Sequence, residues 1–191
     1  MPPVSACTQL DEYRSQLEVN SREARALAEA LAPAFLNWRP EPGRWSIAEC
    51  LAHLATVNQK YLRPIDEAID KARARGWTAP GPFRYGFISH AMVSGMEPPV
   101  SRRSRAPRAF LPSPEMDPAS VLPAFLAMQQ QIARRLEDAR GLDLRRARVV
   151  SPITRLLRLN LGAAFALIAA HNRRHLWQAR QVREHPSFPH A

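Results

Sequence analysis

The strongest signal for the fold is the stretch Trp45-Ser46-Ile47-Ala48-Glu49-Cys50-Leu51-Ala52-His53-Leu54. Ser46 is a good helix N-cap and Glu49 stands three residues later, which is the spacing of a capping box. Side chains suited to a buried face then recur at spacings of three and four: Ile47, Leu51, Leu54, Asn58, Tyr61 and Ile65. The pattern ends near Arg75-Gly76, so we predict one long helix from Ser46 to this glycine.

Three other segments have the same helical period, and none has the alternation of a β-strand. The first runs from Thr8 to Leu31, and Pro33 ends it. The next begins with Asp117 as N-cap and closes at Gly141, and the last covers 160–183. We expect residues 142–159 to be a connector with some helical character. Four long amphipathic helices predict an all-α four-helix bundle, in one domain over 1–191 with its core at about 8–184.

The second and third of these helices are separated by residues 76–116, which hold many of the prolines and several glycines. A connection of this length is unusual in a compact domain and is often functional. We expect it to be a loop, with a short helix within 83–96, that lies like a lid across one end of the bundle. In that position it could shape a pocket.

The chain carries a net charge of +10, and Lys60 and Lys71 are its only lysines. This charge is compatible with an anionic partner such as nucleic acid. However, the arginines are scattered over the predicted helix faces, and we expect the denser 102–108 cluster to be a solvated patch. We therefore predict no specific nucleic-acid partner. No apolar run reaches about 18 residues, and no signal peptide is recognisable, so we expect a cytoplasmic protein without membrane contact.

The two cysteines, Cys7 and Cys50, have no metal-binding spacing and suggest no disulfide framework. Cys50 lies three residues before His53, where it could be a nucleophile or a soft metal ligand. A small buried apolar residue is the more frequent role of such a cysteine, and we favour it here.

The segment His171-Asn172-Arg173-Arg174-His175 carries two imidazoles four residues apart. On a helix they lie on one face, as two ligands of a single metal ion would. His53, on another predicted helix, can supply a third ligand. From spacing alone, a metal site and hydrogen-bonded core histidines are equally supported. Asn172 stands where a zinc peptidase of the HExxH type has its glutamate, which disfavours that chemistry.

At these residues the chain resembles the DinB/YfiT-like superfamily of metal-dependent enzymes, in particular its DinB-like domain group. The segments 45–54 and 171–178 carry the resemblance, which extends over about 10–182. It implies a four-helix bundle of this type, with His53, His171 and His175 as ligands of a divalent metal. Nickel or zinc is the metal expected, with manganese or iron as alternatives. Relatives include transferases and isomerases that use a low-molecular-weight thiol such as bacillithiol or mycothiol, and a homodimer is expected.

These observations lead to a first hypothesis of a metal-dependent thiol transferase or isomerase, or a hydrolase-like enzyme, acting on a small thiol and an electrophile. Glu49 is its candidate catalytic residue, although a capping role is the favoured alternative. Arg174 is its candidate for binding an anionic cofactor, against a solvated helix face. Asn58 and Gln178 are candidates for hydrogen-bond donors that support the ligands, with simple surface exposure as an equal alternative. Trp45 and Trp177 are expected to pack in the core.

Two other hypotheses remain open. In one, the protein is a non-catalytic, metal-stabilised bundle that acts in a stress response or binds a partner. In the other, which only the charge suggests, it associates with nucleic acid.

Overall fold

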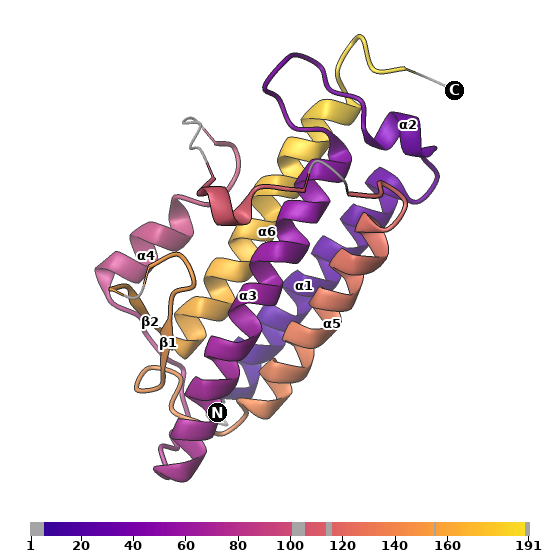
Figure 1. The fold of residues 1–191 in the computed structure, drawn as a ribbon. Helices are drawn as coiled ribbons and strands as arrows, with labels where there is room; N and C mark the ends of the chain where they lie inside the picture. Colours follow the sequence, from indigo (N-terminus) through magenta and orange to yellow (C-terminus); the bar gives the residue numbers. More distant parts are fainter. Residues whose placement is uncertain (1–5, 101–105, 114–115, 155, 190–191) are drawn as a thin grey trace.

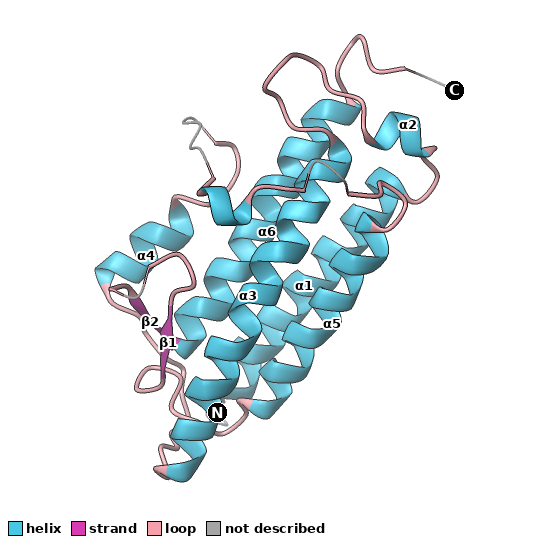
Figure 2. Ribbon diagram, in the orientation of Figure 1, coloured by secondary structure: helices cyan, strands magenta, loops and turns pink. Residues whose placement is uncertain are grey.

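The structure, a computed structural model, describes residues 6–100, 106–113, 116–154 and 156–189, with side chains from Gln9 onward. It is mostly helical, as the sequence predicts, with one small sheet (Figures 1 and 2). The elements in chain order are α1 (Ala6–Ala28), α2 (Pro33–Leu36), α3 (Ile47–Ala74), α4 (Phe87–Ser94), η1 (Arg108–Phe110), α5 (Val121–Asp138), β1 (Arg148–Val150), β2 (Arg158–Asn160) and α6 (Leu161–Arg183).

The four long helices α1, α3, α5 and α6 lie side by side (Figure 1). Helix α3 packs against α5 and α6, and α1 packs against the same two helices, so the contacts close into a ring. Apolar side chains of α1 line the interior, and Leu10, Tyr13, Leu17, Ala24, Leu27 and Ala28 are all buried. The predicted end of this helix at Leu31 was wrong, because α1 ends at Ala28 and Leu31 follows it, only partly buried. In the part of the chain that the structure describes, no helix is long and apolar enough to cross a membrane.

The predicted capping box is present at the start of α3. Glu49 N–H donates to the Ser46 hydroxyl at 3.1 Å, and Ser46 N–H donates to the Glu49 carboxylate at 2.8 Å. The helix continues to Ala74, and Gly76 follows with a φ of +61°, a conformation that glycine adopts without strain. Both ends of the helix that carries His53 are therefore set by local sequence.

The predicted start of the third long helix was wrong by a few residues. Helix α5 begins at Val121 with Ser120 as its N-cap, rather than directly after Asp117. The Asp117 carboxylate instead accepts a hydrogen bond from Ala119 N–H at 3.0 Å. A short acidic side chain that bonds the backbone two residues on favours a turn over a helix, and this turn precedes α5.

The expectation that the chain contains no strand was also wrong. Strands β1 and β2 pair antiparallel within the predicted connector, with Val149 opposite Leu159, and both of these side chains are buried. Each strand has three residues, which is too short for an alternating pattern to be recognised. The pair leads directly into α6, because Leu161 follows β2 and its N–H donates to the carbonyl of Ala147.

The long segment between α3 and α5 holds the short helix expected within 83–96, together with η1. It is fastened to the long helices. Gln9 of α1 both donates to and accepts from the backbone of Phe83, each at 3.2 Å. The Tyr85 hydroxyl lies so close to Gly162 that a β-carbon there would be 1.6 Å away. The arginines at 102, 103 and 105 lie outside the described residues.

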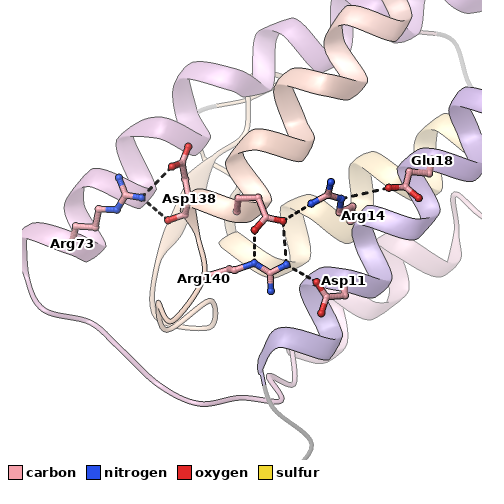
Figure 3. A network of polar contacts seen from close by, with 7 residues as sticks. Asp11, Arg14, Glu18, Arg73, Asp138 and Arg140 are labelled. Carbon is pink, nitrogen blue, oxygen red and sulfur yellow. Dashed lines mark hydrogen bonds and ion pairs between the residues drawn. The ribbon is translucent and has the colours of Figure 1, made fainter.

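Ion pairs join the helices at the end of the bundle near the N-terminus (Figure 3). Arg140 pairs with Asp11 of α1, Arg14 pairs with Glu137 of α5, and Arg73 of α3 pairs with Asp138. The hydrogen bond from Arg140 lowers the pKa of Glu137 below its usual value. These groups are exposed, and surface pairs contribute little to stability, about 0–1 kcal/mol each.

Candidate metal centre

Helices α3 and α6 bring the three predicted histidines together. His53 projects from α3 and is 3% exposed, while His171 and His175 follow each other on successive turns of α6. One ring nitrogen from each lies within 4.8 Å of the other two. Nε2 of His53 and Nε2 of His171 lie 3.4 Å apart. Two helices that are neighbours in the bundle (Figure 1) thus build one cluster of imidazoles.

Hydrogen bonds on the far side of two rings fix their orientation. Nδ1 of His53 lies 2.7 Å from the backbone carbonyl of Phe110, and Nδ1 of His175 lies 3.1 Å from Oε1 of Gln178. A carbonyl oxygen can only accept, so each Nδ1 carries the hydrogen and the Nε2 of the neutral ring keeps its lone pair. This is how proteins commonly orient histidines that bind metals. Gln178 thus supports a histidine, as the sequence suggested, although it accepts the hydrogen bond instead of donating it.

The surroundings hold all three imidazoles in the neutral form. Burial lowers the pKa of His53, and burial followed by the charges of its neighbours His171 and His53 lowers that of His175 well below its usual value. For His171, burial and the nearby charges of His53 and Arg174 lower the pKa to about 3. Neutral imidazole is the form that binds metal, so no proton has to leave these rings at neutral pH.

The indole of Trp45 forms one wall of the cluster. Its ring lies 4.8 Å from that of His53 and stacks on His175 at 5.6 Å, with an interplanar angle of 29°. Trp45 is partly buried and packs against the core, as expected, but its contact with the histidines was not predicted. It directly precedes Ser46, so the N-cap of α3 also sets the position of this wall.

The segment after α4 is held against the helix that carries His171 and His175. Arg174 donates to the carbonyl of Gly95 at 3.1 Å, and Arg173 pairs with Glu97 and donates to Gln16. Burial lowers the pKa of Arg174, and its positive charge acts on both neighbouring histidines. Arg174 therefore lies close enough to the cluster to attract an anionic group bound there.

Other residues that the sequence suggested lie apart from the imidazoles. The Glu49 carboxylate is occupied by the capping box and by Arg39, whose guanidinium donates to it at 2.6 and 2.9 Å. Cys50 is fully buried, and burial raises the pKa of its thiol far above the usual value, which disfavours the thiolate. It is thus a small buried residue, as favoured from the sequence. Asn58 is buried in the core.

Sequence reasoning missed the carbonyl of Phe110. The atom belongs to the backbone of η1, inside a segment expected to be a loop, and no side-chain pattern identifies such a partner. The signal present in the sequence was an aromatic residue among prolines, because such a residue can anchor a loop to the core. Phe110 is 3% exposed and has this role.

Comparison with known protein families identifies the chain's relatives. The family model described as the DinB superfamily matches residues 16–179, a range that contains all three histidines. No curated protein and no solved structure matches the chain.

Proposed function

The chain belongs to the DinB superfamily, and we propose that it is a divalent-metal-dependent enzyme with His53, His171 and His175 as its metal ligands. One observation carries the proposal. The Nε2 atoms of His53 and His171 lie 3.4 Å apart, while Nδ1 of His53 is already committed to a carbonyl. Nε2 of His53 therefore directs a lone pair at Nε2 of His171. Nδ1 of His171 has no hydrogen-bond partner in the described part of the chain, so a cation can bind both Nε2 atoms when the hydrogen of His171 lies on Nδ1.

The residues fit a metal ion on geometric grounds. Two imidazole nitrogens bound to one tetrahedral ion, each at about 2.0–2.1 Å, lie about 3.3 Å apart. The nitrogens of His53 and His171 nearly meet this distance without any movement. The imidazole donor set suits nickel and zinc, and also manganese or iron, so these remain the metals we propose. Three protein ligands would leave a position open for a substrate.

We propose a transferase or isomerase reaction that uses a low-molecular-weight thiol and an electrophile. A divalent ion held by the histidines would favour the thiolate form of a bound thiol at neutral pH. The surrounding residues have distinct roles in this proposal. Trp45 excludes water from one side, Phe110 and Gln178 hold the rings in place, and Arg174 attracts the carboxylate of the thiol. Glu49 fixes the N-terminus of α3, and its catalytic role stays a prediction.

The family resemblance and the composition support further proposals about the architecture, the oligomeric state and the location of the protein. They include a single domain with the DinB/YfiT-like arrangement of four helices and a lid-like segment between α3 and α5. They also include a homodimer in the cytoplasm without a specific nucleic-acid or membrane partner.

The enzymatic proposal is tested with metal-loaded protein, a panel of small thiols and a panel of electrophiles. We expect turnover that disappears with a chelator and in His53→Ala. Arg174→Ala should raise KM for thiols that carry a carboxylate but not for a neutral thiol. Arg183→Ala, on the same helix, is the matched control. Metal-loaded protein that turns over no combination would contradict the thiol reaction while leaving the metal site intact.

The alternative is a metal-stabilised bundle without catalytic activity. It is favoured by the environment of Glu49, the candidate catalytic residue, whose carboxylate is already occupied by the capping box and by Arg39. In this case the metal raises the melting temperature, and no thiol or electrophile is consumed. A melt together with the turnover assay separates the two functions, because only the enzyme gives both results.

A further inference from the structure

Each of the four long helices buries one carboxamide side chain in the bundle core. The residues are Asn20 on α1, Asn58 on α3, Gln129 on α5 and Asn172 on α6. Gln129 is 3% exposed and the three asparagines are 0% exposed. Amide side chains are rarely buried to this extent unless they are hydrogen-bonded. The presence of one on every long helix therefore requires a physical explanation.

The four carboxamides lie near one level of the bundle, where one apolar cluster gives way to the next. The first cluster contains Leu17, Ile132 and Ala169, and the second contains Ala24, Phe125 and Leu176. On each of three helices, the amide lies in sequence between a residue of the first cluster and a residue of the second. Asn20 of α1 lies between Leu17 and Ala24, Gln129 of α5 between Ile132 and Phe125, and Asn172 of α6 between Ala169 and Leu176.

Asn58 occupies the matching place on α3. It lies between Leu54 of the second cluster and Tyr61 of the first. A direct bond confirms that two of the helices are level here, because Nδ2 of Asn20 donates to the carbonyl of Ala169 on α6 at 3.2 Å. With a rise of about 1.5 Å per residue, that carbonyl lies about 4.5 Å along α6 from Asn172. The carboxamides thus form a polar layer through the core.

Almost all the polar atoms of this layer lack a partner. Apart from Nδ2 of Asn20, every side-chain nitrogen and oxygen of the four residues is buried without a hydrogen bond to the described part of the protein. An unsatisfied buried group costs about 1–3 kcal/mol. The helices themselves are continuous through this level, so their backbone groups are already paired. The partners of these atoms are therefore either the other carboxamides of the layer or a small polar molecule in the core.

We propose that this carboxamide layer is a binding site for ordered internal water molecules. Each amide presents two N–H donors and a carbonyl acceptor, and water is the small ligand that both accepts and donates. The four side chains carry no charge, so they offer nothing to neutralise a buried anion or metal ion. An apolar ligand would leave the same polar atoms unpaired. Water that bridges amides from different helices satisfies them all.

Asn172 follows His171 in the sequence, but no carboxamide atom of the layer forms a hydrogen bond with a histidine, and the proposal does not depend on the metal. Its consequence is structural specificity, because bridging waters fix the heights of the four helices relative to one another. A helix that slid by one turn would place its amide against an apolar cluster. Single buried asparagines set the register of helix packing in coiled coils by the same principle.

A crystal structure of the full chain at a resolution that shows ordered water tests the proposal. We expect internal water within about 2.7–3.2 Å of carboxamide atoms from at least two helices. Carboxamides that bond only to one another or to protein groups, with no water between the helices, would overturn it. Density for a ligand other than water would overturn it equally.

Variants locate the water. Asn58→Leu and Gln129→Leu should each remove the water bound to that residue. Gln130→Leu, at the neighbouring exposed position, should leave all internal water in place. Internal water that persists unchanged in both core variants would contradict the assignment. If a core variant fails to fold, the structure of the unmodified chain still decides between water and direct amide pairing.

Discussion

The backbone carbonyl of Phe110 accepts a hydrogen bond from Nδ1 of His53 at 2.7 Å, across 57 positions of the sequence. This contact joins the long segment between α3 and α5 to the candidate metal centre. It fixes which nitrogen of His53 faces His171, and the buried Phe110 ring holds the carbonyl in place. The connecting segment therefore helps to build the site that it adjoins.

Replacing Phe110 with alanine should weaken both the fold and metal binding. Loss of a buried phenylalanine ring costs about 3–5 kcal/mol, and loss of the partner behind a metal-binding histidine lowers affinity about 10–100-fold. Calorimetric titration with zinc and a urea melt measure the two effects. Phe87→Ala is the control, because this phenylalanine is 84% exposed. Zinc affinity in Phe110→Ala equal to that of the unmodified chain would argue against a role for the carbonyl.

Gln178 provides a cleaner test of ligand orientation, because the acceptor is a side chain. Gln178→Leu removes the oxygen that bonds Nδ1 of His175, so we expect zinc affinity to fall about 10–100-fold. Gln178→Glu keeps an acceptor and should retain most of the affinity. Equal zinc affinities in Gln178→Leu and Gln178→Glu would contradict the role of the Gln178 oxygen in orienting His175.

The stability of the metal-free protein should fall as the pH falls below about 6.5, the usual pKa of histidine. The folded pKa values of His53, His171 and His175 are all lowered, so the unfolded chain binds more protons in this range. Each group contributes up to about 1.4 kcal/mol per pH unit. Above about pH 6.5 the full stabilising contribution of each neutral histidine is present. This contribution is lost as the pH falls toward the pKa of the folded protein, which is about 3 for His171.

Urea melts in the presence of a chelator, from about pH 7 down to pH 5, measure this slope. His171→Leu should reduce it, whereas His90→Leu, at an exposed position, should leave it unchanged. A melt that is independent of pH over this interval would show that the imidazoles are not held neutral in the folded protein.

The capping box at the start of α3 should contribute measurably to stability. Ser46→Ala removes the hydroxyl that accepts from Glu49 N–H, which costs about 0.5–2 kcal/mol. Ser15→Ala is the control, because Ser15 is exposed inside α1 and lies away from the end of its helix. Chemical denaturation of both variants compares them. Equal losses would mean that the hydroxyl of Ser46 is not acting as a cap.

The helices and the histidine cluster were predictable because both depend on local spacing. The capping box marks the start of α3, and residues four apart on α6 share a face. Only the joining of His53 to His171 and His175 needed more than local spacing. The predicted helices offered His53 as a third ligand, and the family resemblance strengthened that hypothesis. The interior of a bundle brings such positions on neighbouring helices together.

The features that were missed depend on contacts distant in sequence. The strands β1 and β2 are three residues each, and pairing with each other rather than periodicity makes them strands. The carbonyl of Phe110 belongs to the backbone, so the type of residue at position 110 does not predict its hydrogen bond with His53. The start of α5 shifted because Asp117 bonds its own neighbourhood as a turn. In each case the local structure is set by a contact that the spacing of residue types in the sequence does not reveal.

The most direct test of the central claim is the divalent metal content of the untagged purified protein, measured by elemental analysis beside His53→Ala and His171→Ala. We predict close to one nickel, zinc, manganese or iron ion per chain, lost in both variants, with a melting transition that rises when metal is restored. A metal concentration about 1,000 times the dissociation constant stabilises the fold by about 4 kcal/mol. Protein that is isolated without metal, stays folded and takes up none of these ions would contradict the account.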